Sequence, residues 1–188
     1  MKARRVKGLD ADMPLADGAE RIVATRLAEL WELAATAQEP EAAVALHDTR
    51  IAAKRLRYVL EITAPCFGPY ATTAIKKAKG IQELLGDIHD CDEMLPRLDD
   101  LRRRLRDREA AYLVGHGLDG DPPNADGYRG LERLAVELTA RRAQLFADWR
   151  ALWVELRRLG FRARLEHAIT ERSHIDNAEG APEGTLHV

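Results

Sequence analysis

The chain has 188 residues and a formal net charge of −2, with 46% hydrophobic, 32% charged and only 5% aromatic residues. These values favour one globular domain with an aliphatic core and exclude collagen-like and mucin-like chains. Two cysteines are too few for a disulfide framework, which favours a reduced, cytoplasmic setting. No run of apolar residues is long enough to predict a membrane segment.

The first half of the chain predicts an arm and three helices. Residues 1–16 form an irregular arm that Pro14 closes. Apolar residues then recur at helical spacing, with breaks at Pro40 and at the turn Pro65–Pro69. The predicted helices cover the ranges 17–38, 41–64 and 71–89.

The second half predicts three more helical segments. Asp90–Glu93 can cap a helix that starts at residue 94 or 96 and ends at 114. A loop rich in Gly and Pro follows over 115–127. The last helices are predicted over 128–159 and 161–170, with Gly160 as a kink or a break.

The fold class that this pattern predicts is all-α, because no stretch alternates as a strand would. We expect an antiparallel helical bundle of about five to six helices joined by short loops. The predicted domain boundaries are an arm over 1–16, a helical domain over 17–172 and a disordered tail over 173–188.

Charge is unevenly distributed, and a basic block stands out. Residues 47–79 contain seven Lys and Arg residues against two acids, whereas residues 80–100 contain seven acids against one Arg. At about 100° per residue, one side of the helix over 41–64 carries His47, Arg50, Lys54 and Arg57. The opposite side carries Ala52, Leu56, Val59 and Leu60. The spacing alone is compatible with an ordinary solvated face or with an anion site.

The next helix repeats the arrangement. Lys76, Lys79, Gln82, Gly86 and His89 share one side of the helix predicted over 71–89. Gly86 allows close approach of a ligand or, as we favour, of another helix. If the two helices form a hairpin, their basic sides would line one groove.

Two runs of sequence resemble a known family. The run His47–Tyr58, HDTRIAAKRLRY, resembles the signature of CHAD domains, the conserved histidine α-helical domains. The run Lys79–Asp90, KGIQELLGDIHD, resembles that family's second motif. We expect the resemblance to extend over residues 17–170. It implies a helical bundle that binds inorganic polyphosphate without catalysis.

The resemblance also implies the phosphate contacts. They are His47, Arg50, Lys54, Arg55 and Arg57 from the signature, with Lys76 and Lys79 from the following helix. In one respect the chain departs from the family, whose members usually have two such helical halves. Here only one motif is present, because the cluster Arg102–Arg108 lacks its histidine and its Lys-Arg-Leu-Arg-Tyr run.

Other chemistry is weakly supported. His47 and Asp48 are adjacent, so they point about 100° apart and do not converge on a metal together with His89, Asp90 or Asp92. Magnesium-dependent hydrolysis would need convergent acids, for which the candidates are Asp87, Asp90, Asp92 and Glu93. Neither Cys66 nor Cys91 has an activating partner in the sequence. We expect no metal, no cofactor and no catalytic residue.

Nucleic acid is the competing polyanion, and a helical scaffold without a ligand is a third reading. The pI of about 6.3 and the lack of aromatic stacking platforms argue against nucleic acid. The chain is expected in the cytoplasm, where it could associate with polyphosphate granules, and not at a membrane.

A homodimer is the favoured assembly, because two copies could surround the ligand from both sides. Trp149 and Trp153 could anchor its interface or lie in the core. In the alternative, a monomer, the Arg102–Arg108 and Arg141–Arg142 clusters close the groove.

Overall fold

The computed structural model describes residues 2–171, without the side chains of residues 125 and 126. All regular structure in this range is helical, which confirms the predicted all-α bundle. The elements are α1 (Leu15–Thr36), α2 (Ala43–Thr63), the short 3₁₀-helix η1 (Ala64–Cys66), α3 (Tyr70–His116), α4 (Ala125–Arg158) and α5 (Phe161–Thr170). The predicted tail lies outside the described residues, and the domain boundaries stay a prediction.

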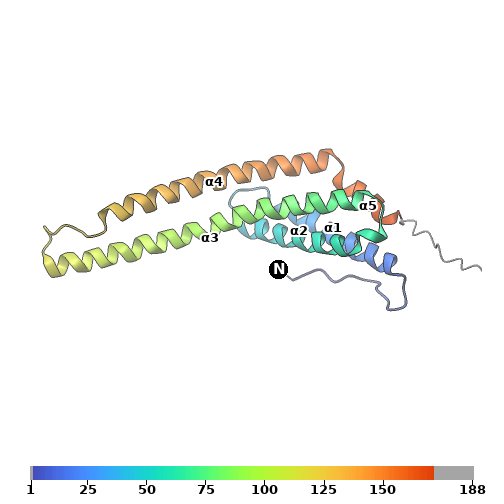
Figure 1. The fold of residues 1–188 in the computed structure, drawn as a ribbon, viewed down its shortest axis with the longest axis horizontal. Helices are drawn as coiled ribbons and strands as arrows, with labels where there is room; N and C mark the ends of the chain where they lie inside the picture. The colour runs from blue at the N-terminus through green and yellow to red at the C-terminus, as the bar shows by residue number, and fades with distance from the viewer. Residues whose placement is uncertain (1, 172–188) are drawn as a thin grey trace, which may run out of the picture.

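The helices form a packed bundle from which a two-helix hairpin projects. Figure 1 shows α1, α2, α5 and the first half of α3 together, with the rest of α3 and much of α4 extending away from them. The buried core follows this division, because no described residue from 99 to 148 is buried. Its largest members include Leu27, Leu56, Leu85, Trp149 and Phe161, one from each α-helix.

The prediction of a separate helix starting at residue 94 or 96 is wrong, because α3 runs unbroken from Tyr70 to His116 with Pro96 inside it. Asp90–Glu93 are therefore helix residues and not a cap. A proline inside a helix removes one backbone hydrogen bond. The buried side chains of Ile88, Cys91 and Leu98 continue at helical spacing across this point, and their packing outweighs that loss.

Two tryptophans of α4 lie in the core. Trp149 is fully buried and Trp153 is 5% exposed. The indole nitrogen of Trp149 donates a hydrogen bond of 2.7 Å to the carbonyl oxygen of Ala37, which ends α1. Of the two roles considered for this pair, the structure shows the core role, and the residues are not free to anchor a second copy.

Of the kink or break expected at Gly160, the structure shows a break, between α4 and α5. Gly160 has a φ of +64°, a left-handed conformation that side chains disfavour. The reversal folds α5 back so that Phe161 and Leu165 are buried against α1 and α3.

Candidate functional site

The basic side of α2 lies opposite its core-facing side, as the sequence predicts. Ala52, Leu56 and Leu60 are fully buried, and Val59 packs against the core while partly exposed. His47, Arg50, Lys54 and Arg57 are partly exposed. The cationic groups therefore face solvent without displacing the apolar contacts that hold α2 in place.

Helix α3 packs antiparallel to α2 and brings its own polar residues alongside. The imidazole rings of His47 and His89 lie 5.2 Å apart. A Cβ atom at Gly86 would lie 3.6 Å from Nε of Arg50. Both pairs fix the same antiparallel register, which places Lys54 level with Gln82 and Arg57 level with Lys79. We call the α2–α3 surface the set formed by these eight residues: His47, Arg50, Lys54 and Arg57 of α2, and Lys79, Gln82, Gly86 and His89 of α3.

Three polar atoms of this surface are buried without a hydrogen-bond partner among the described residues. They are Nε of Arg50, Nε of Arg57 and Oε1 of Gln82. An unsatisfied buried polar group costs about 1–3 kcal/mol, so a ligand that satisfies one recovers that free energy. Rotating the Gln82 amide by 180° would present its NH₂ group at the same place.

Other cations of the surface have nearby partners. Nε of Arg57 lies 3.3 Å from a carboxylate oxygen of Glu61, and Nζ of Lys79 lies 3.6 Å from one of Glu83. The Arg57 guanidinium also lies 4.5 Å from the ring centre of Tyr58, and Nζ of Lys54 lies 5.7 Å from it. The Lys79–Glu83 pair is exposed, and exposed pairs are weak and exchange readily for a stronger anion.

Two of the residues implied by the family resemblance, Arg55 and Lys76, are not among these eight. Arg55 is on the side of α2 that faces α1, where its guanidinium lies 3.3 Å from a carboxylate oxygen of Glu29. Lys76 is exposed about 60° around α3 from Lys79. Its neighbour Lys77 points towards α4 and binds Glu155 at 3.2 Å.

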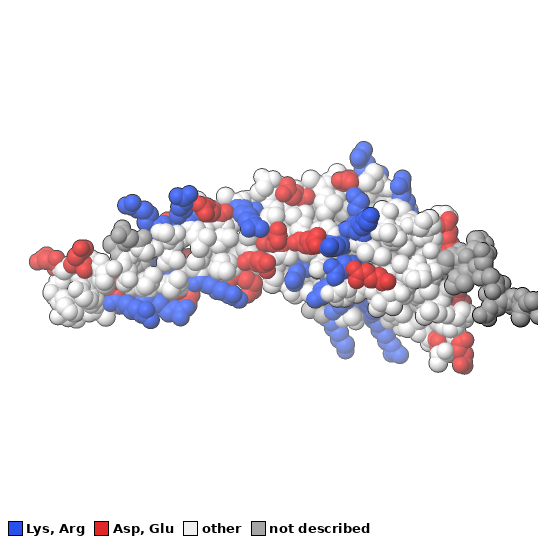
Figure 2. All heavy atoms as spheres, viewed as in Figure 1, with Lys and Arg blue, Asp and Glu red and all other residues white. Residues whose placement is uncertain are grey.

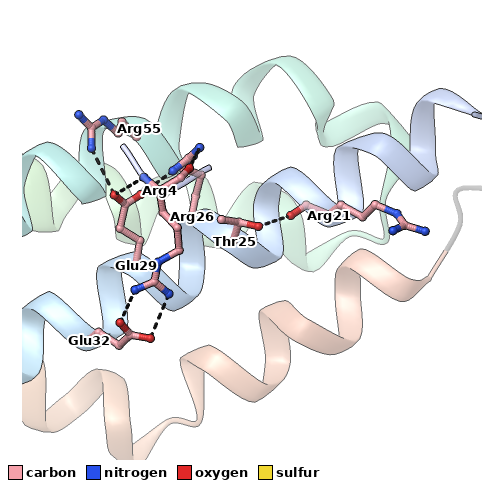
Figure 3. A network of polar contacts seen from close by, with 7 residues as sticks. All are labelled: Arg4, Arg21, Thr25, Arg26, Glu29, Glu32 and Arg55. Atoms are coloured by element: carbon pink, nitrogen blue, oxygen red, sulfur yellow. Dashed lines mark hydrogen bonds and ion pairs between the residues drawn. The ribbon is translucent and has the colours of Figure 1, made fainter. Parts of the chain in front are cut away.

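The sequence did not predict the polar network around Glu29. This carboxylate of α1 is only 4% exposed. It accepts hydrogen bonds from Arg26 at 2.6 Å, from Arg55 at 3.3 Å and from the backbone nitrogen of Arg4 at 3.2 Å (Figure 3). The sequence did contain a signal for this network. Glu29 lies between the apolar residues Leu27 and Leu30 and follows Arg26 by three positions.

The same network fixes the N-terminal arm. The Arg4 guanidinium pairs with Glu32, and the Arg4 carbonyl oxygen accepts a hydrogen bond of 2.8 Å from Arg26. The hydrogen bond from Arg4 lowers the pKa of the Glu32 carboxyl, which favours its charged form. The arm is thus irregular, as predicted, but tied to α1.

Three of the four acids considered for magnesium are paired with arginines. Asp92 binds Arg142 of α4 at 2.7 Å, Asp87 lies 3.5 Å from Arg141, and Glu93 binds Arg97 at 3.1 Å. Among residues 2–171, no group of three His, Cys, Asp or Glu residues is placed to hold a metal ion. Burial raises the pKa of the Cys91 thiol, which disfavours the reactive thiolate.

Charges elsewhere on the molecule are mixed. Figure 2 shows Lys and Arg interspersed with Asp and Glu on the displayed face, including the projecting hairpin. No helix within the described part of the chain is long and apolar enough to span a membrane.

The model of the CHAD domain family matches residues 2–99, just over half of the chain. This protein therefore belongs to the CHAD domain family, whose domains are associated in general with polyphosphate binding. The match begins inside the N-terminal arm and ends in α3 shortly after Pro96, a range that differs from the expected 17–170. No curated protein and no solved structure matches the chain.

Proposed function

We propose that this protein binds inorganic polyphosphate at the α2–α3 surface and does not act on it chemically. The observation that carries the proposal is the position of Arg50, Lys54 and Arg57 on the solvent side of α2, beside Gln82 and Gly86 of α3. Membership of the CHAD family supports polyphosphate as the anion.

The physical basis is charge-assisted hydrogen bonding to a linear polyanion. Cations three and four residues apart recur about every turn of α2, so a polyphosphate chain lying along the helix can meet a cation at each turn. The guanidinium groups of Arg50 and Arg57 match the geometry of phosphate oxygens. The unpartnered Nε of Arg50 would gain an acceptor.

One observation and one chemical requirement support binding without hydrolysis. The nearby acids Asp87, Asp92 and Glu93 already pair with arginines, so they are not gathered around a metal-binding space. Phosphoanhydride hydrolysis normally requires metal ions held by several carboxylates beside the phosphate. We expect polyphosphate incubated with the protein and magnesium to keep its chain length on a gel. Release of orthophosphate above the protein-free control would contradict this part of the proposal.

The binding test compares two double variants. Arg50→Gln/Lys54→Gln should weaken binding of long-chain polyphosphate about tenfold or more, since each lost phosphate contact removes counterion release. The matched control is Arg106→Gln/Arg108→Gln, which removes the same charge from exposed residues of the projecting hairpin. An equal loss in both variants would show that only overall charge matters and would overturn the site.

Salt and competition separate the ligand classes. Affinity for polyphosphate should fall steeply as salt rises. Polyphosphate should displace a labelled oligonucleotide at lower phosphate concentration than the oligonucleotide needs to displace polyphosphate. The reverse order would favour the nucleic-acid reading, and no binding of either would favour a scaffold.

For the assembly we propose a homodimer in the cytoplasm that associates with polyphosphate granules. In the structure, Arg102, Arg141 and Arg142 are paired with acids of α3 or α4, which weakens the alternative in which these clusters close the site. Light scattering with and without polyphosphate tests the dimer, and a monomer mass in both conditions would overturn it. Imaging of the tagged protein against a polyphosphate stain tests the location.

A further inference from the structure

A second basic site lies between the N-terminal arm and α1. A pocket of about 430 Å³ is lined by Arg4, Arg5 and Lys7 of the arm and by Arg21 of α1, with Ala24 and Ala28 beneath them. No acid lines this pocket. Four cations around one pocket would repel one another by a few tenths of a kcal/mol per close pair unless an anion joined them.

The four cations of this pocket differ in their pairing. Arg4 is paired with Glu32. Within residues 2–171, by contrast, no ion pair involves Arg5, Lys7 or Arg21. On the hairpin, Arg102, Arg104 and Arg133 each pair with an acid, whereas no ion pair within the described residues involves Arg106, Arg108 or Arg129. We call Arg5, Lys7 and Arg21 the arm site.

The arm site is held in place before any ligand arrives. Both the backbone nitrogen and the carbonyl oxygen of Arg4 are bound, to Glu29 and Arg26 respectively. The arm then turns at Gly8, which has a φ of +73°. The Arg21 guanidinium occupies the space that a Cβ atom at Gly8 would need. Binding therefore does not have to order a free tail.

The arm site and the α2–α3 surface lie on opposite sides of one shared contact. Glu29 binds Arg55 of α2 on one side and the backbone of Arg4 on the other. In Figure 3, Arg55, Arg4 and Arg26 gather around Glu29, and Arg21 lies further along α1. A polyanion that extends from one site to the other would lie next to Arg55, whose side chain is 27% exposed.

We propose that the arm site is a second phosphate-binding site, occupied by another segment of the polyphosphate chain that lies on the α2–α3 surface. This inference rests on the proposed function for its ligand. A second attachment point makes further binding intramolecular and raises the affinity for chains long enough to reach both sites. The arm is then a determinant of chain-length preference.

Lysine footprinting tests the two sites separately. The chain has six lysines, at positions 2, 7, 54, 76, 77 and 79. Each is acetylated under limiting reagent, with and without long-chain polyphosphate, and its rate is measured by mass spectrometry. We expect Lys7, Lys54 and Lys79 to be protected several-fold. Lys77, which binds Glu155 on the α4 side of α3, is the internal control.

The outcomes distinguish the two proposals. Protection of Lys54 and Lys79 with an unchanged rate at Lys7 would overturn the arm site and leave the proposed function standing. Protection of Lys7 alone would overturn the α2–α3 surface. Equal protection of Lys7 by orthophosphate at the same phosphate concentration would show a site for the free ion and overturn the bridging chain.

A triple variant measures the contribution of the arm. Arg5→Gln/Lys7→Gln/Arg21→Gln should weaken binding of long chains about tenfold and leave binding of tripolyphosphate at the α2–α3 surface unchanged. Arg106→Gln/Arg108→Gln/Arg129→Gln is the charge-matched control, on exposed residues of the hairpin. Equal weakening by the two triple variants, or an equal effect on short and long chains, would overturn the inference.

Discussion

The substitution Glu29→Gln tests whether one buried carboxylate holds the arm, α1 and α2 together. Glu29 is 4% exposed and binds Arg26, Arg55 and the backbone of Arg4. Glutamine has nearly the same shape and keeps a carbonyl acceptor, so the change removes the charge and leaves the packing. The two arginines would then lack their counter-charge.

The size of the effect follows from burial. Removing one partner of a fully buried ion pair costs about 3–5 kcal/mol. Here the side chains of Arg26 and Arg55 are 12% and 27% exposed and can partly turn to water. The amide oxygen still accepts one hydrogen bond. We therefore expect a loss of about 2–3 kcal/mol in the free energy of unfolding.

Two assays measure this loss. Urea unfolding followed by far-ultraviolet circular dichroism gives the change in unfolding free energy. Limited trypsin digestion measures release of the arm, because cleavage after Arg5 and Lys7 requires the arm to leave α1. The control is Glu32→Gln, which breaks an exposed pair with Arg4 and should have a smaller effect. If both variants lose the same stability and are cut at the same rate, Glu29 is not the anchor.

Four further variants test which sides of α2 and α3 are buried and whether α3 needs its proline. Leu56→Ala should lower the free energy of unfolding by about 2–5 kcal/mol because Leu56 is fully buried, whereas Arg50→Gln/Lys54→Gln should change it by no more than about 0.5 kcal/mol. Equal losses in urea unfolding would refute the assignment of a buried and a solvent-facing side of α2. Gly86→Ala should stabilise α3 by up to about 1 kcal/mol, since a Cβ there meets only Arg50 at ordinary contact distance; destabilisation in the same assay would mean that another helix needs the space. Pro96→Ala should raise the thermal midpoint and add about 1–3 kcal/mol by restoring one helical hydrogen bond; a lower midpoint would mean that α3 needs the proline.

The sequence predicted the helices and the two sides of α2 because both depend on local geometry. Apolar periodicity marks a helix whatever surrounds it, and a rotation of about 100° per residue separates Leu56 from Arg50 and Lys54. The family resemblance, carried by residues 47–58 and 79–90, is also a property of consecutive residues and is confirmed. For the same reason the sequence indicated that the basic sides of two successive helices could meet.

Only the tertiary structure decided which neighbour meets each side chain. Arg55 belongs to the same sequence motif as Arg50, yet a buried acid from α1 lies beside it. Asp90–Glu93 and Pro96 read as a helix start, yet packing of Ile88, Cys91 and Leu98 outweighs the lost hydrogen bond. The basic arm could have been a free tail, but Glu29 and Arg26 bind its backbone. Contacts between residues distant in sequence depend on the packing of whole helices, and local periodicity does not encode that packing.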